Sequence, residues 1–419
     1  MKNKILILLT LLPLTTAAEV QKSIDFKTYI NQVCENNIAY AAQKLNIPIA
    51  QANIQAAKVF NDPTLSIEYA YNDDHRMQMG QGLTGELSKT FSPGKRTARI
   101  ELARSEKEMT AALLDDYLAA LRAEATIAYL EAIKEGEMYQ VKLNSYLSIS
   151  ELAKSDSIKW RLGKITETDA LQSRIEAQVT YNDLRQAQSD MYRSYAALNV
   201  HLSQFKADTI YVPTGGLRVG IRKFEVADIL EEALNNRADL VAALRNVAVA
   251  QKALKLVRRE RNIDLDLTLG YNYNTQVRNE TAPAPSFSGL TFGVAIPLKF
   301  SNFNRGVILA ASLKAAQAQS SYRQAQIEVQ TQVMQNHNQY VALSAQVERY
   351  TNGVLAKAKA VIDGKIYSYS RGESSLLEVL SAQRTYNDLR AMYIQTLFDH
   401  AVSLVFLERS VGFWDIAIE

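Results

Sequence analysis

The chain has almost no cysteine, which excludes a disulfide-stabilised fold. Cys34 is the one cysteine among 419 residues, so no disulfide can form within the chain. When the two halves of the sequence are aligned with a shift of 200 residues, Cys34 falls on Leu234, an apolar helical position. We therefore expect a small core residue rather than a reactive thiol. Cys34 also does not directly follow the signal peptide described below, so we do not expect an N-terminal lipid anchor.

An excess of charge of one sign is also absent. The 47 basic and 44 acidic residues give a net charge of +3, so there is no electrostatic reason to expect a nucleic-acid partner. Long apolar runs are confined to the N-terminus, MKNKILILLTLLPLTTAAEV, where two lysines precede a short apolar stretch and small residues. This is typical of a secretory signal peptide, which we place at residues 1–18. The stretch is too short for a transmembrane helix, and no later stretch is longer.

Proline is scarce where long helices are possible. The eight prolines leave residues 94–212 and 298–419 without any, and proline disrupts helix interiors. The spacing of apolar residues in both stretches predicts long helices with a seam for another helix. A helix over 95–154 would be about 90 Å long. The seam residues are Leu114, Leu118, Leu121, Ala125, Ala128 and Ala132, and then Ala311, Ala315, Ala318, Tyr322, Ala325 and Val329.

The chain repeats itself. TYNDLR occurs at 180–185 and again at 385–390, and shifts of 200 to 209 residues align other parts of the two halves. Gly163 aligns with Gly372, and each lies in a segment suited to a chain reversal, WRLGKITE and YSRGESS. We infer an internal duplication with repeats at 19–212 and 213–419. Each repeat would contain a helix, two strands and a long helical hairpin, and the glycine-rich VPTGGLRVG would link them.

Four segments before the long helices alternate apolar and polar residues: TLSIEYAY, GLTGELSKTF, DLDLTLGYNY and GLTFGVAIPLKF. A period of two over about ten residues, with aromatic residues near the ends, is typical of outer-membrane strands, although a soluble hairpin packed on a helix is the alternative. Four strands cannot close a barrel alone, and an open edge cannot face lipid. The sequence therefore predicts a mainly α fold with a small β part. Long antiparallel coiled-coil hairpins would form an α-barrel, and three chains would close a trimeric 12-stranded membrane β-barrel.

These segments resemble the TolC-type outer-membrane efflux proteins, and the resemblance covers essentially the whole mature chain. It is most specific in SRGESSLLEVLSAQRTYNDLR (370–390), NNRADLVAALRNVAVAQKALKLVRRERNIDLDLTLGY (235–271) and IPLKFSNFNRG (296–306). It is nearest to the branch that serves heavy-metal (copper or cobalt-zinc-cadmium) efflux pumps. Many members of that branch carry an N-terminal lipid, and this chain lacks the cysteine that would hold it.

The resemblance implies a homotrimeric channel in the outer membrane that extends into the periplasm. Its helical tips would contact a periplasmic adaptor (a membrane fusion protein), and an inner-membrane RND-type pump would supply the energy. Outer-membrane lipid is a further expected partner, and no cofactor is implied. Solvated turns with a capping glycine are the alternative for the tips. By resemblance, the adaptor-contacting tips are Arg161, Leu162, Gly163, Lys164, Arg371 and Gly372.

The resemblance also points to a periplasmic aperture. LEVLSAQ at 377–383 matches the family's acidic run, with Glu378 at the first acid and Ser381 in place of the second. Asp169 aligns with Glu378 in the first repeat. Three copies of Glu378 would form a ring that favours cations, whereas an ordinary exposed carboxylate is the alternative.

The sequence contains no nucleophile elbow, phosphate loop, zinc-protease pair or dinucleotide fingerprint, so we expect no enzyme. Asp73, Asp74, His75, Met77 and Met79 include metal-binding residue types without the spacing of a ligand set, and we interpret them as a polar hairpin loop. The leading hypothesis is a passive conduit for efflux of heavy-metal cations. Multidrug or bile-salt efflux, a type I secretion channel and a structural helical-rod envelope protein are the alternatives.

Overall fold

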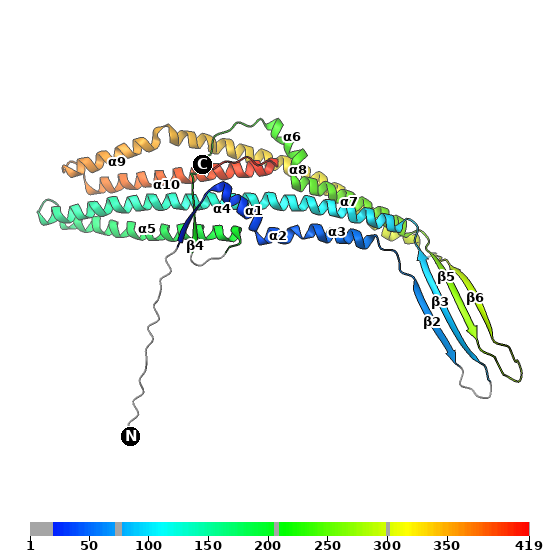
Figure 1. The fold of residues 1–419 in the computed structure, drawn as a ribbon. Helices are drawn as coiled ribbons and strands as arrows, with labels where there is room; N and C mark the ends of the chain where they lie inside the picture. Colours follow the sequence, from blue (N-terminus) through cyan, green and yellow to red (C-terminus); the bar gives the residue numbers. More distant parts are fainter. Residues whose placement is uncertain (1–19, 72–77, 205–208, 299–301, 419) are drawn as a thin grey trace, which may run out of the picture. The chain divides into compact units, whose positions relative to one another are not determined.

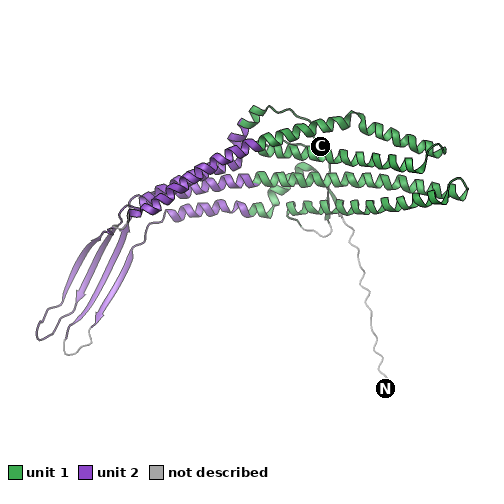
Figure 2. Cartoon of the chain, turned by 180° about the vertical axis from the view of Figure 1, so that it is seen from behind, with its two compact units in different colours: residues 1–41, 118–230, 332–419 green, residues 42–117, 231–331 purple. Residues whose placement is uncertain are grey.

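The computed structural model describes residues 20–71, 78–204, 209–298 and 302–418, and the expected signal peptide lies outside them. The chain divides into two compact units (Figure 2). Unit 1 comprises Met1–Ala41, Leu118–Leu230 and Gln332–Glu419, and unit 2 comprises Ala42–Tyr117 and Glu231–Thr331. Each unit therefore contains segments from both of the predicted sequence repeats.

Unit 2 contains a four-stranded antiparallel sheet in the order β2-β3-β5-β6. The strands are β2 (Thr64–Tyr71), β3 (Gln81–Phe91), β5 (Leu265–Asn274) and β6 (Phe287–Ala295) (Figure 1). All four were expected from the alternating pattern. β3 pairs with β5 at the centre, so the sheet joins the strand pair of one repeat to that of the other.

One face of this sheet is apolar and is left exposed by the residues that the structure describes. The register places Leu65 opposite Leu87, Leu87 opposite Leu269 and Leu269 opposite Phe292, so these side chains share a face. Ile67 is 70% exposed and Phe292 is 78% exposed. Within the part of the chain that the structure describes, β2 and β6 have no strand on their outer sides. The described part of a single chain thus leaves an apolar face and two sheet edges without a partner.

The fourth strand is shorter than the alternation predicted. β6 ends at Ala295, whereas the pattern continued to Phe300. Pro297 has no backbone N–H to donate to a neighbouring strand, so hydrogen-bonded pairing is not expected to continue through it. Phe300 itself lies outside the described residues.

The helices of unit 2 pack through small side chains and ion pairs. The unit contains α3 (Asn46–Ala57), α7 (Ala238–Glu260) and parts of α2 (Ile38–Lys44), α4, α6 (Val226–Asn236) and α8, with the short η1 (Asn302–Asn304). Glu101 on α4 accepts from Lys252 at 3.1 Å and Lys255 at 2.7 Å, both on α7. Further along the same two helices, Arg245 pairs with Glu108 at 3.0 Å. These contacts attach α7 to the beginning of α4.

Unit 1 contains most of two long helical hairpins, as the proline-free stretches predicted. The first consists of α4 (Lys95–Arg161) and α5 (Glu167–Leu202), and the second consists of α8 (Arg305–Arg349), α9 (Leu355–Ser370) and α10 (Leu376–Val411) (Figure 1). α4 runs to Arg161 rather than to residue 154. The predicted seam faces inward, because Leu121, Ala125 and Ala132 are buried.

The second hairpin has a break that the sequence pattern did not predict. The π-helical segment η2 (Tyr350–Val354) separates α8 from α9, and Gly353 there has φ 104°. Asn352 also leaves the helical region, with ψ 28°. Glycine adopts such a backbone without the steric cost that a Cβ brings. The absence of proline therefore did not guarantee an uninterrupted helix.

A two-stranded parallel sheet in unit 1 was also not expected. It pairs β1 (Val20–Ile24) with β4 (Thr209–Pro213). The Tyr129 hydroxyl lies 2.9 Å from the carbonyl oxygen of Ile24 and 2.6 Å from that of Thr214, and its ring contacts Phe26 and Tyr29 of α1 (Phe26–Asn36). The start of the expected linker, just after β4, is therefore held against α4.

Candidate functional site

The two hairpins of unit 1 have turns of the same type at their tips. At the first tip, Gly163 has φ 68° and the N–H of Lys164 donates to the carbonyl of Lys159 at 2.9 Å. At the second, Gly372 has φ 80° and the N–H of Glu373 donates to the carbonyl of Ser368 at 3.0 Å. A left-handed glycine with this hydrogen bond closes a helix C-terminus. The predicted chain reversals are confirmed, and their geometry is repeated in the two halves.

The returning helices begin with matching caps. The Thr166 hydroxyl accepts from the N–H of Asp169 at 3.1 Å, and the Ser375 hydroxyl accepts from the N–H of Glu378 at 3.3 Å. A hydroxyl residue followed three positions later by an acid satisfies free N–H groups at a helix start. The two acids that we predicted at an aperture therefore lie in the first turns of the returning helices, where their N–H groups are capped.

Glu378 has a positive partner on the facing helix. Lys365 of α9 donates to its carboxylate at 2.5 Å, and both side chains are exposed to solvent. The hydrogen bond and charge of Lys365 hold the pKa of Glu378 below its usual range. Ser381 lies one turn further along α10 and is exposed. The second predicted aperture position thus carries a small hydroxyl rather than a charge.

Apolar side chains are exposed near both tips. Leu162 is 65% exposed at the first turn, and Leu377 is 68% exposed at the second. Trp160, which was not among the predicted tip residues, is 40% exposed beside the first turn. The cations are held by local contacts, since the Arg161 Nε donates to the carbonyl of Ser157 and Arg371 stacks on the ring of Tyr367. The tips therefore present both apolar and basic groups.

A buried polar contact joins the two hairpins close to the tips. The Tyr369 hydroxyl of α9 donates to Asp156 Oδ1 of α4 at 2.9 Å, and Asp156 is fully buried. Lys159 lies 3.8 Å from the same carboxylate oxygen and 4.3 Å from the centre of the Tyr369 ring. Burial, followed by the hydrogen bond to Asp156, raises the pKa of Tyr369.

This contact was missed because its residues are distant in sequence. One signal was available: Tyr369 aligns with Trp160 at the shift of 209 that aligns the two tips. The contact lies beside a hydrophobic cluster that draws on α4, α9 and α10 and comprises Ile149, Ile362, Tyr369, Leu376, Val379 and Leu380.

Further contacts between the hairpins lie along α10. Arg384 donates to both carboxylate oxygens of Glu176 on α5, at 3.0 and 2.9 Å. Asn387, in the second TYNDLR copy, donates to the Ser145 hydroxyl of α4 at 2.7 Å. Its counterpart Asn182 is exposed. The two copies therefore have the same sequence but different surroundings.

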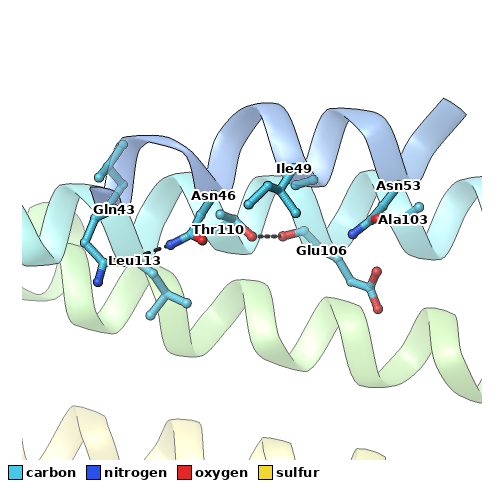
Figure 3. Close-up of a pocket in the computed structure, with 10 residues that line it drawn as sticks. Gln43, Asn46, Ile49, Asn53, Ala103, Glu106, Thr110 and Leu113 are labelled. Carbon is cyan, nitrogen blue, oxygen red and sulfur yellow. Dashed lines mark hydrogen bonds between the residues drawn. The ribbon is translucent and has the colours of Figure 1, made fainter. Parts of the chain in front are cut away.

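Two cavities lie between helices of the described residues. In unit 2 a cavity of about 270 Å³ lies between α3 and α4 (Figure 3). Asn46 donates to Gln43 there at 2.8 Å, and the Thr110 hydroxyl donates to the Glu106 carbonyl of its own helix. In unit 1 a cavity of about 520 Å³ lies between α4 and the α9–α10 pair. The first is lined mainly by amide, hydroxyl and aliphatic side chains, and the second also by the charged side chains of Glu151, Lys154, Lys359, Asp363 and Arg390.

Metal-ligand clusters and membrane-spanning helices are both absent from the described part of the chain. Within the described residues, no group of three or more His, Cys, Asp or Glu side chains could hold a metal ion. Four of the five residues considered for a soft-metal site, Asp73, Asp74, His75 and Met77, lie outside those residues. Among the helices that the structure describes, none is long and apolar enough to cross a membrane.

Comparison with known protein sequences identifies relatives of this chain. Residues 229–412 match the profile of a family described as outer membrane efflux protein. The cobalt-zinc-cadmium resistance protein CzcC of Cupriavidus metallidurans is 24% identical over 379 residues, which cover 90% of this chain and 86% of CzcC.

Solved structures share the fold. The chain is similar to CusC, described for its folding and transmembrane channel formation, with a TM-score of 0.77, 17% identity and coverage of 93% of this chain and 92% of CusC. The outer membrane channel CmeC of Campylobacter jejuni gives a TM-score of 0.74 at 14% identity, with coverage of 92% and 85%. MtrE, an outer membrane channel of Neisseria gonorrhoeae, gives a TM-score of 0.72 at 15% identity, and the match covers 92% of this chain and 88% of MtrE.

Proposed function

We propose that the chain, whose residues 229–412 match the outer membrane efflux protein family, is the outer-membrane conduit of a tripartite system that exports heavy-metal cations. The observation that carries the proposal is the sheet of unit 2. Its apolar face is exposed in the single chain, as shown by Ile67 and Phe292, and burial of such a face in lipid would be strongly favourable. A structural rod of the envelope would need no such sheet.

The working form is a homotrimer. The outer edges of β2 and β6 carry backbone groups that no described strand of the same chain satisfies, and such groups are costly in lipid. Pairing β6 of one copy with β2 of the next removes both edges, and three copies supply twelve strands in a closed ring. The two hairpins of each copy then supply repeating units of a helical wall.

The tips are the adaptor-binding surface. Leu162 and Leu377 are exposed beside turns that already satisfy their own backbone groups, so the turns themselves need no apolar side chains in solvent. Basic side chains flank them at Arg161, Lys164 and Arg371. A periplasmic adaptor that presents apolar and acidic side chains matches this surface, and an RND-type pump behind it would drive transport.

Heavy-metal cations are the preferred cargo because CzcC, a relative that covers most of this chain, is a cobalt-zinc-cadmium resistance protein. Deleting the gene is expected to sensitise cells to cobalt, zinc, cadmium, copper, nickel or silver salts and to leave bile-salt, dye and detergent resistance unchanged. The test compares growth across both sets of compounds, with and without the restored gene. Sensitivity to the organic compounds alone would favour multidrug or bile-salt efflux instead.

Neutralising the predicted aperture acid is expected to weaken cation selectivity. Three copies of Glu378 bring negative charge to the pore, and Glu378→Gln removes it while glutamine can still cap the start of α10. We expect a severalfold lower cation-to-anion permeability ratio in planar bilayers. Glu373→Gln is the matched control, since Glu373 is an acid of the same tip outside the cap. Equal selectivity in wild type and Glu378→Gln would contradict the aperture role.

A further inference from the structure

A second cavity of unit 2 lies where the sheet meets the helices. It has a volume of about 300 Å³ and is formed by the segment after α3, the end of β3 and the first turns of α4. Phe60 is 64% exposed at its margin, and Phe91 is 47% exposed. Its lining residues are Val59, Phe60, Asn61, Lys89, Thr90, Phe91, Ser92, Pro93, Arg96 and Arg99.

The lining combines positive charge with apolar surface and contains no carboxylate. Arg96 is fixed in place, because its Nε donates to the carbonyl of Lys58 at 2.6 Å and its guanidinium lies 4.1 Å from the centre of the Phe60 ring. Lys89 and Arg99 are exposed and form no ion pair with any acid of the described residues. Two cations therefore remain available to an anion.

Two acids at the start of β5 are already engaged. Asp264 forms an ion pair with Lys95 at 2.6 Å, and Asp266 accepts a short hydrogen bond from the Thr90 hydroxyl. Neither lines the cavity. The positive potential of Lys89 and Arg99 is therefore not cancelled by a fixed partner, and a ligand with negative charge would be attracted to the site.

The cavity lies at one end of the apolar face of the sheet. Alternation along β3 places Lys89 and Phe91 on the same face as Leu83 and Leu87. Along that face the side chains change from aliphatic to basic and aromatic within one strand. This order matches the passage from acyl chains to headgroups in a bilayer, where lysine, arginine and aromatic rings are favoured.

The second repeat does not reproduce this combination. At the shifts that align the repeats, Lys89 corresponds to Leu298, Arg99 to Ile308 and Phe60 to Glu260. The other aromatic residue and the fixed arginine are retained, as Phe300 and Arg305, so the two free cations are what distinguish the first repeat. A charge pattern that only anchored strands at the membrane surface would be expected in both repeats. Its presence in one repeat indicates a discrete site.

We propose that this cavity binds the phosphate headgroup of an anionic phospholipid in the periplasmic leaflet. Lys89 and Arg99 contact the phosphate, and the first acyl carbons pack on Phe60 and Phe91. The proposal rests on the proposed function, since it requires the sheet to lie in the outer membrane.

The test measures lipid binding to the purified full-length protein by native mass spectrometry. Detergent-extracted protein is titrated with phosphatidylglycerol, with phosphatidylethanolamine and with soluble glycerol 3-phosphate. We expect preferential binding of phosphatidylglycerol, with little binding of the other two. Lys89→Gln/Arg99→Gln is expected to lower the phosphatidylglycerol affinity by about tenfold or more, because each basic residue at a lipid surface contributes substantially.

The matched control is Lys314→Gln/Arg323→Gln, which removes two exposed cations from α8 of the same unit. Equal loss of binding in both double variants, or equal binding of phosphatidylglycerol and phosphatidylethanolamine, would overturn the site. Glycerol 3-phosphate bound as tightly as the lipid would replace it with a site for free phosphate esters. Ion conductance of the same variants separates the two proposals: a conducting wild type without phosphatidylglycerol preference refutes this site alone, and a protein that never inserts into bilayers refutes the proposed function.

Discussion

Replacing Gly372 by tryptophan is expected to abolish efflux while leaving the amount of assembled protein unchanged. No heavy atom lies within 4 Å of a Cβ built at this position, so the indole would project away from its own chain. The backbone has φ 80°, and a side chain there costs about 1–2 kcal/mol. That cost is small for hairpins of this length, whereas a large ring at the centre of the proposed adaptor-binding surface would prevent close contact.

Gly372→Ala is the control, since it imposes the same backbone cost without the bulk. We expect growth on the sensitising metal salts to be lost for the tryptophan variant and retained for the alanine variant. Site-specific cross-linking to the adaptor should fall in parallel, while the oligomer in the outer-membrane fraction stays constant. Normal efflux by the tryptophan variant would remove Gly372 from the adaptor-binding surface.

Replacing Tyr369 by phenylalanine is expected to destabilise unit 1 and to raise channel conductance severalfold. The change removes the hydroxyl that donates to the buried Asp156, whose other carboxylate oxygen already has no hydrogen-bond partner among the described residues. A buried acceptor left unsatisfied costs about 1–3 kcal/mol, and more when it is charged. Asp156 would relieve this cost by moving toward water, which separates the two hairpins near their tips.

The double variant Tyr369→Phe/Asp156→Leu separates stability from opening. Because it replaces both hydrogen-bonded groups by apolar ones and leaves only the partly exposed Lys159 without its acidic neighbour, it should recover part of the lost thermal stability. It still lacks the contact between α4 and α9, so its conductance should remain high. Thermal unfolding in detergent and single-channel recordings measure the two effects. Wild-type conductance in both variants would show that this contact does not restrain the channel.

The sequence predicted those parts of the architecture that depend on local residue patterns or on the internal repeat. Strands and helices followed from periods of two and of about three and a half residues, which report whether one side of a segment is apolar. The tips followed from the aligned Gly163 and Gly372, since a left-handed position favours the same residue in both copies. The repeated TYNDLR indicated a duplication, from which we expected these elements to occur as two equivalent sets. The boundaries of its repeats and the roles of the tip and aperture residues remain predictions.

Other features depended on which segments become neighbours in space. The Tyr369–Asp156 contact joins residues 213 positions apart, and the central pairing of β3 with β5 joins the two repeats. The cap formed by Ser375 gave Glu378 a structural role that its place in the sequence pattern did not suggest. Local patterns were therefore sufficient for the kinds of elements and their repetition. Only the tertiary structure revealed the contacts that join the hairpins and the cavity where the sheet meets the helices. The physical reason is that periodicity tells which side of an element is buried but not which element covers it.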